Sequence, residues 1–150
     1  MLIRLFGDKY AIIDEEDYKL ISQYKWHVNH YGYAVCNKYV GNYKSTAIFM
    51  HRLIMQTPKG MDTDHINHNP LDNRKSNLRV CTHANNQKNL SLRKNNTSGV
   101  RGVRWHKQLQ KWNARIYVNG KEISLGCYRD LKEATKARKD ASLRYYGEFA

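Results

Sequence analysis

Apolar and polar positions alternate most regularly in the last third of the chain. In KWNARIYV, residues 111–118, every second side chain is Trp, Ala, Ile or Val, and Lys, Asn, Arg and Tyr lie between them. This period of two predicts a strand with one apolar face. VRGVRWH at 100–106 and KEISLGC at 121–127 are typical of two further strands, and Asn119-Gly120 is a strong hairpin signal. The pattern predicts a three-stranded antiparallel sheet.

A helix is predicted directly after this sheet. Asp130, with Glu133 three residues later, resembles a capping box, and Gly147 is a typical helix end. Because one helix covers only one face of such a sheet, we expect the apolar face to pack on the helix and the basic face to be exposed. The expected packing stripe of the helix consists of Leu131, Ala134, Ala141 and Tyr145.

The first 50 residues are predicted to form a small α+β segment. KYAII at 9–13 and GYAVCNKYV at 32–40 are typical of strands, and TAIFMHRLI at 46–54 is typical of a strand that runs into a helical turn. DEEDYKLISQYKW at 14–26 has acidic residues early and lysine late, which suits the dipole of a helix. With 6 basic and 5 acidic residues the segment is nearly neutral, and we expect it to be scaffold.

The middle of the chain is rich in asparagine and histidine. DTDHINHNPLDNRKSNLRVCTHANNQKN, residues 62–89, contains seven Asn and three His among its 28 residues. DTDHI and LRVC are typical of strands, the segment between them is full of turn formers, and Thr82 suits the N-cap of a helix. The predicted order is strand, loop, strand, helix.

These patterns together predict an α+β protein in three parts. The parts are a small N-terminal α+β scaffold (1–50), a ββα core (51–94), and a polar linker followed by a three-stranded antiparallel sheet packed on one helix (95–150).

The net charge of the chain narrows the range of functions to consider. The 26 Lys and Arg against 13 Asp and Glu give a net charge of +13, of which 51–94 contributes +5 and 95–150 contributes +7. Such a field favours a polyanion such as nucleic acid. No stretch approaches the roughly 18 apolar residues of a membrane span, and the N-terminus lacks a signal-peptide pattern. We expect no membrane partner.

The three cysteines, Cys36, Cys81 and Cys127, are isolated in the sequence. No Cys-x-x-Cys pair exists, so neither a zinc knuckle nor a disulfide framework is supported. A reducing, cytoplasmic location is the expected one.

Candidate chemistry gathers in the Asn- and His-rich stretch. Asp64 and His65 fall on the first predicted strand, and Asn86 falls one turn into the predicted helix. Carboxylate and amide oxygens are hard ligands suited to Mg²⁺. A neutral imidazole can take a proton from water near neutral pH. A metal that holds a phosphate beside a histidine that activates water is the arrangement of a phosphodiester hydrolase.

The stretch resembles the HNH endonuclease family, whose core is the ββα-metal fold. The resemblance rests on HRLI, DHINHNPLDNRKSNLRVCT and NNQKN, and covers about 51–90. It implies that Asp64 and Asn86 bind one divalent metal, Mg²⁺ or alternatively Mn²⁺, and that His65 is the general base. The middle asparagine of the motif falls on Asn77, which would orient the loop or the base.

The order of the segments resembles phage- or intron-encoded HNH homing endonucleases. This implies double-stranded DNA as partner, a bacterial host cytoplasm as location, and a monomer that nicks or a homodimer that cuts both strands. Arg74 and Arg79 are candidate DNA contacts, although a solvated-face interpretation is close behind.

The C-terminal part resembles the ethylene-response-factor (APETALA-type) DNA-binding domain in VRGVRW, KWNARI and LGCYRDLKEATKAR. In that family the sheet lies in the major groove. Arg115 stands where the family usually has an acid, so the base preference is not carried over, and strand alternation favours a core position for Trp112. The DNA-binding candidates implied are Arg101, Arg104, Lys111, Trp112 and Arg115.

Three functions compete at this point. The first is a metal-dependent DNA endonuclease of the homing type. The second is a non-catalytic DNA-binding regulator that retains the HNH fold, against which the intact Asp64, His65 and Asn86 argue. The third is a basic RNA-binding protein, against which the lack of an aromatic stacking platform argues. Metal-dependent strand scission separates the first from the others.

Overall fold

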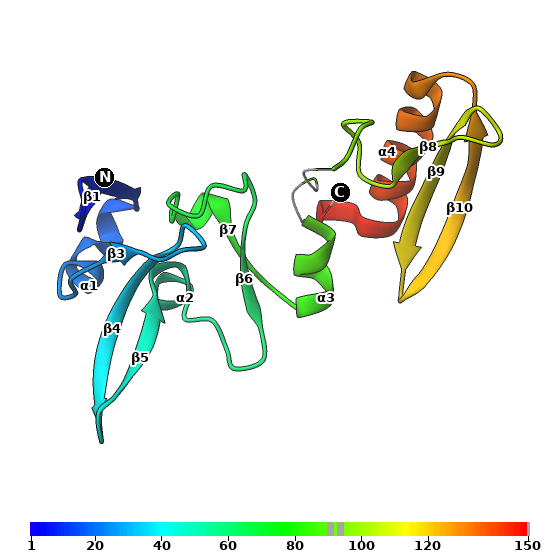
Figure 1. The fold of residues 1–150 in the computed structure, drawn as a ribbon. Helices are drawn as coiled ribbons and strands as arrows, with labels where there is room; N and C mark the ends of the chain where they lie inside the picture. Colours follow the sequence, from blue (N-terminus) through cyan, green and yellow to red (C-terminus); the bar gives the residue numbers. More distant parts are fainter. Residues whose placement is uncertain (90–91, 93–94, 150) are drawn as a thin grey trace. The chain divides into compact units, whose positions relative to one another are not determined.

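The computed structural model describes residues 1–89, 92 and 95–149, and within them the predicted α+β class is confirmed (Figure 1). The chain divides into two compact units, Met1–Asn86 and Gln87–Ala150. Each unit has its own sheets and its own hydrophobic cluster, and each is described by itself below.

The first unit begins with two small antiparallel sheets. β1 (Leu2–Leu5) pairs with β2 (Lys9–Ile12), and a three-stranded sheet has the order β3-β4-β5. The strands of the second sheet and the helical elements around it are β3 (His27–Val28), β4 (Ala34–Gly41), β5 (Lys44–Phe49), the 3-10 turn η1 (Glu15–Asp17), α1 (Tyr18–Ile21) and α2 (Met50–Ile54).

The predicted strand, loop, strand, helix order is present in the second half of this unit. β6 (Asp62–His65) pairs antiparallel with β7 (Leu78–Cys81), and α3 (His83–Asn86) follows. The loop between the strands contains the 3-10 turn η2 (Lys75–Asn77). Thr82 acts as the predicted N-cap, because its Oγ1 accepts a hydrogen bond from the backbone N–H of Asn85 at 3.3 Å.

One hydrophobic core serves all of residues 1–86. Segments 1–50 and 51–86, expected as separate parts, therefore share the same buried interior. Its buried members are Leu5, Ala11, Ile13, Ile21, Trp26, Ala34, Cys36, Met50, Ile54 and Leu78.

The helix expected over 14–26 is much shorter than the sequence pattern suggested. Helical structure ends at Ile21, and Trp26 is buried, with 4 % of its surface exposed. The indole Nε1 of Trp26 donates to the carbonyl of Ile21 at 2.8 Å, so this side chain satisfies a carbonyl at the end of the helix. Burying a tryptophan in the core outweighs the extra helical turns that the charge pattern favoured.

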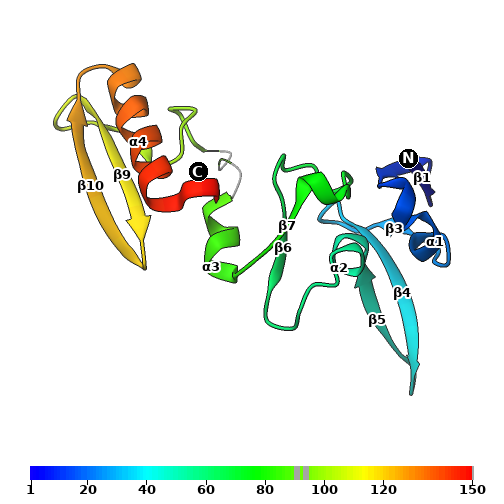
Figure 2. The same ribbon diagram turned by 180° about the vertical axis from the view of Figure 1, so that it is seen from behind.

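The second unit contains the predicted three-stranded sheet followed by a helix. The short 3-10 turn η3 (Gln87–Asn89) opens it, and the sheet order is β10-β9-β8. Figure 2 shows α4 lying along the sheet. The elements are β8 (Val103–His106), β9 (Lys111–Val118), β10 (Lys121–Tyr128), α4 (Leu131–Tyr146) and η4 (Gly147–Phe149).

Local chemistry explains the boundaries of these elements. Asn119 and Gly120 have φ values of 50° and 76°, as a two-residue hairpin with a type I′ turn requires. Asp130 caps α4 by accepting from the backbone N–H of Lys132 at 2.9 Å, and Gly147 ends the helix with a φ of 56°.

The packing stripe of α4 differs from the predicted one in one member. Ala134 and Ala141 are buried and Leu131 packs on the core, but Tyr145 is exposed. Arg138 is buried in its place, because it follows Ala134 by one helical turn and so lies on the same face.

Candidate active site in the first unit

The loop between β6 and β7 is held in place by the first segment of the chain. The backbone N–H of Ile12 donates to Leu71 at 2.8 Å, and that of Asn73 donates to Ile12 at 2.7 Å. Asp14 accepts from the backbone N–H of Lys75 at 2.8 Å. The N-terminal segment therefore fixes this loop through two main-chain hydrogen bonds and one to the Asp14 carboxylate.

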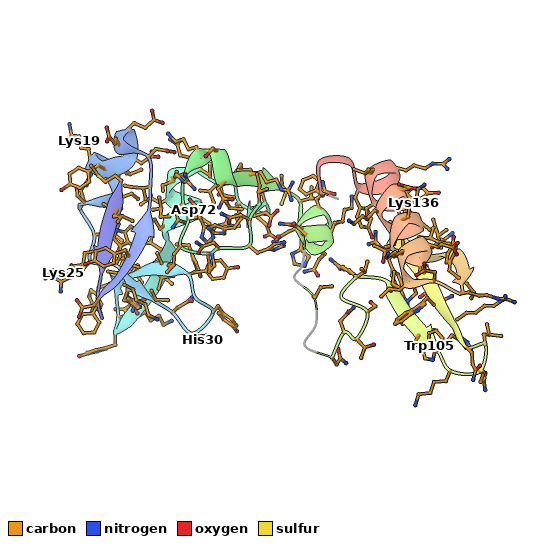
Figure 3. All side chains as sticks on the ribbon, turned by 90° about the horizontal axis from the view of Figure 1, so that it is seen from above. Lys19, Lys25, His30, Asp72, Trp105 and Lys136 are labelled. Atoms are coloured by element: carbon orange, nitrogen blue, oxygen red, sulfur yellow. The ribbon has the colours of Figure 1, made fainter. Side chains whose placement is uncertain are left out.

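Buried polar side chains hold the loop together from inside. Asp72, labelled in Figure 3, is 2 % exposed and forms a two-bond ion pair with Arg74, at 2.8 and 2.7 Å. Asn77 accepts from the backbone N–H of Asn67 at 3.0 Å and donates to the carbonyl of Asp72 at 2.8 Å. Asn77 thus braces the loop by these two bonds, and its proposed catalytic part stays a prediction.

His65 lies at the end of β6 against this loop. Its side chain is buried, and its Nε2 lies 3.3 Å from Oδ1 of Asn73. Burial lowers the pKa of His65, opposed by the hydrogen bond to Asn73 and by the nearby Asp64 and Asp72 carboxylates. The imidazole is therefore neutral at neutral pH. Asn73, expected only as a turn residue, is fully buried and contacts the candidate base.

A second histidine, His51, lies beside His65; the sequence predicted only that it could pack the first helical turn against the site. The rings of His51 and His65 meet edge to face with centroids 5.0 Å apart, and Tyr33 lies 5.8 Å from the ring of His65. Burial lowers the pKa of His51 to about 3, with further lowering from His65 and Arg52. His51 is thus a neutral wall of the site, and its position in HRLI was the only sequence signal.

These two histidines predict acid-sensitive stability of the first unit. Their pKa values are lower folded than unfolded, so the unfolded chain binds more protons as pH falls below about 6.5. The free energy of unfolding therefore has its full value above that pH. At about pH 5, His51 alone lowers it by roughly 2 kcal/mol. Urea denaturation at both pH values should show this loss.

A His51→Phe variant is the control, because phenylalanine fills a similar volume and does not titrate. The Nδ1 atom of His51 has no hydrogen-bond partner to lose. The variant should have a clearly flatter pH dependence. An equal slope in both proteins would contradict the assignment of the effect to His51.

Carboxylates and an amide gather on the other face of β6. Asp64 forms an ion pair with Arg79, whose Nε and Nη2 lie 2.8 and 2.7 Å from its Oδ2. Asp62, two residues earlier and on the same face, accepts from the Asn86 amide at 3.0 Å and contacts His83 Nδ1 at 2.9 Å. These contacts lower the pKa of Asp62, the Asn86 hydrogen bond contributing most. Asp62 was missed, although its i, i+2 spacing to Asp64 was a usable signal.

Asp64 and Asn86 carry oxygen atoms of the kind that a hard divalent cation prefers. Asp62 binds the amide nitrogen of Asn86, which fixes the orientation of that amide and directs its oxygen away from Asp62. Asp64 and Asn86 therefore offer a carboxylate and an amide oxygen from β6 and α3. Within the described ranges, no group of three or more His, Cys, Asp or Glu side chains could hold a metal by itself.

The candidate DNA contacts lie in different surroundings. Arg74 and Arg79 both pair with carboxylates in the first unit. In the second unit, the register places Arg104, Lys111 and Arg115 on the sheet face opposite the buried Ala114.

Trp112 lies on the inner face of this sheet, as the strand alternation favoured. It packs on the core and meets Trp105 edge to face at 5.2 Å. Trp105, labelled in Figure 3, belongs to the edge strand β8. Arg101 donates to the carbonyl of Lys88 at 2.8 Å.

Comparison with known proteins places this site in a family. Residues 49–88 match the family model described as HNH endonuclease, and they include Asp64, His65, Asn77 and Asn86. The chain is 34% identical to "Protein 3.8" of Escherichia phage T7 over 93 residues, which are 62% of this chain and 76% of that protein. It is 27% identical over 147 residues to "Uncharacterized HNH endonuclease L560" of Acanthamoeba polyphaga mimivirus, covering 94% and 73%. No solved structure matches.

The described helices are short or polar. None of them is long and apolar enough to cross a bilayer.

Proposed function

Since this chain belongs to the HNH endonuclease family, we propose that it hydrolyses phosphodiester bonds of double-stranded DNA with the help of a divalent metal ion. The observation that carries the proposal is the position of His65. It is a buried, neutral imidazole whose Nε2 contacts Asn73, and it follows Asp64 directly on β6.

His65 is the proposed general base. With Nε2 protonated and donating to Oδ1 of Asn73, the lone pair of the neutral ring is on Nδ1. Nδ1 takes a proton from water, and the water oxygen forms a bond to phosphorus as the P–O3′ bond breaks. The products are a 5′-phosphate and a 3′-hydroxyl, whose oxygen takes up a proton.

Asp64 and Asn86 are the proposed metal ligands. A bound Mg²⁺ or Mn²⁺ supplies Lewis-acid stabilisation of the charge on the phosphate. Asp62 positions Asn86 through the amide nitrogen, and Arg79 positions the carboxylate of Asp64. Arg79 also lowers the negative charge that DNA meets at this face, which favours approach of a phosphate.

The second unit is the proposed DNA-binding module. Its sheet presents Arg104, Lys111 and Arg115 on the face that α4 leaves uncovered, and residues 95–150 carry +7. A sheet of this size fits the major groove, and the resemblance to ethylene-response-factor domains supports the same use. The phage and viral relatives support an origin among mobile or viral nucleases.

A supercoiled-plasmid assay tests the proposed function. The full chain is incubated with Mg²⁺, with Mn²⁺ or with EDTA, and an Asp64→Asn variant is run in parallel. We expect open-circle or linear product only from the wild type with metal, because Asp64→Asn keeps the shape and removes the charge. Asp8→Asn is the matched control, since Asp8 is an exposed carboxylate of the same unit.

Two results would overturn the assignment. Cleavage that persists in EDTA, or an Asp64→Asn variant as active as Asp8→Asn, would exclude the proposed metal site. Tight DNA binding without cleavage of any substrate would make the protein a DNA-binding regulator with a retained HNH fold.

A further inference from the structure

A pocket in the second unit is lined by four arginines and, among the described residues, by no carboxylate. It has a volume of about 590 Å³, and residues of segment 92–104, β9 and α4 surround it. The pocket exists because β8 is shorter than β9, so no strand pairs with the last half of β9 on that side. The arginines are Arg101, Arg104, Arg115 and Arg138.

Arg138 is the unusual member of this group. Only 6 % of its surface is exposed, and its Nε has no hydrogen-bond partner. Its Nη1 donates to the hydroxyl of Ser142, and its guanidinium lies 5.5 Å from the ring centroid of Tyr146. Among the residues that the structure describes, no carboxylate forms an ion pair with Arg138.

A buried cation without an anion is unfavourable. Removing a guanidinium from water costs several kcal/mol unless a partner compensates, and arginine does not escape this cost by losing its proton. Burial lowers the pKa of Arg138; Tyr146 opposes this effect and the nearby Arg101 adds to it. Among the described residues, Arg138 therefore has no carboxylate in an ion pair with it.

The backbone is shaped to admit this side chain. A Cβ on Gly102 would lie 2.7 Å from Nε of Arg138 and 2.3 Å from the carbonyl oxygen of Arg115. Glycine at this position lets Arg138 pass beneath the backbone and reach the pocket. The backbone N–H of Arg115 donates to the carbonyl of Gly102 at 2.8 Å, which fixes this wall of the pocket.

The other three arginines of the pocket differ in the hydrogen bonds and ion pairs that they form. Arg115 forms an ion pair with Glu122 at 2.6 Å, and Arg101 donates to the carbonyl of Lys88. Arg104 is exposed, and no hydrogen bond or ion pair of its side chain is found among the described residues. Among the described residues, Arg104 and Arg138 thus form no ion pair, although Arg104 acts electrostatically on Glu122.

We propose that this pocket binds one phosphate group of the DNA backbone, held by Arg138 from below and Arg104 at the rim. A guanidinium matches phosphate with two parallel hydrogen bonds, so a phosphate supplies an anion that the described residues do not offer to Arg138. Arg104 and Arg115 also lie on the outer sheet face, so a backbone that crosses this face passes the pocket. That this phosphate belongs to DNA rests on the proposed function.

The test compares Arg138→Met with wild type in full-length protein. DNA affinity is measured by fluorescence anisotropy over a series of salt concentrations. We expect about tenfold weaker binding and a fall of about one in the slope of log K against log salt, as for one lost phosphate contact. Lys136→Met is the control, because Lys136 is an exposed cation on the same helix (Figure 3). It should change binding by less than about twofold.

Stability separates a binding role from a structural one. Methionine keeps the apolar stem and removes the unpaired charge, so Arg138→Met should melt at the same temperature as wild type or higher. Inorganic phosphate, compared with chloride at equal ionic strength, should raise the melting temperature of wild type and not of the variant. The phosphate measurement tests the pocket even if DNA binding or cleavage fails.

Two results would contradict a phosphate site in this pocket. If Arg138→Met binds DNA with the wild-type slope and phosphate stabilises neither protein, the pocket is not a phosphate site. If Arg138→Met fails to fold, Arg138 is structural and the inference is wrong unless Arg104→Met, at the exposed rim, shows both the lost slope and the lost phosphate effect.

Discussion

Replacing His65 with alanine is expected to lower the rate of DNA cleavage about 10²- to 10⁴-fold, the usual contribution of a general base. The imidazole is buried beside Asn73 and its pKa is lowered by burial, so it is neutral at neutral pH and has a lone pair that can accept a proton. Alanine removes the proton acceptor but leaves the basic surfaces of both units unchanged. DNA affinity should therefore change by no more than a few-fold.

Single-turnover cleavage and a binding titration, carried out on the same preparations, measure the two effects separately. His30→Ala is the matched control, because His30 is an exposed histidine of the same unit and contacts only Tyr31 in the ring interactions found. The control should cleave at the wild-type rate. A His65→Ala protein that cleaves as fast as the control would show that another group activates the water.

Gly102→Ala should destabilise the second unit by about 3–5 kcal/mol. The added Cβ would lie 2.3 Å from the backbone carbonyl oxygen of Arg115, and the φ of +77° is unfavourable for any L side chain. Neither atom can move without breaking the hydrogen bond from Arg115 to Gly102. DNA binding should weaken with the sheet, while the first unit keeps its stability.

Gly99→Ala separates the two causes of this effect. Gly99 has a similar φ of +71°, but a Cβ there meets nothing within 4 Å. It should cost only about 1 kcal/mol, from backbone strain alone. Hydrogen exchange of the amides in β9 and β10, followed by mass spectrometry, reports on the second unit separately from the first. Equal losses in the two variants would contradict the close approach at Gly102.

The candidate site was predictable in part. Asp64, His65 and Asn86 were proposed from a motif whose residue order and spacing can be read directly in the sequence. Asp62 was missed, and His51 was expected only to pack against the site, because their contacts depend on the tertiary structure. Asp62 matters through the Asn86 amide, and His51 through a ring contact with His65.

The sequence by itself determined the features that rest on local chemistry. Alternation with a period of two assigned the side chains of β9 to the two faces of the sheet. Asn119-Gly120 determined the hairpin, and Asp130 and Gly147 determined the ends of α4. Each of these depends on residues close together in the chain, whose conformational preferences are the same wherever the segment lies.

Only the tertiary structure decided the features that depend on distant partners. The helix at 14–26 stops early because Trp26 is drawn into a core built from the whole first unit. The loop carrying Asn73 is fixed by hydrogen bonds to Ile12, far away in the sequence. Arg138 is buried because Gly102 leaves room for it. Burial and contact between remote segments are collective properties of packing, and no local pattern contains them.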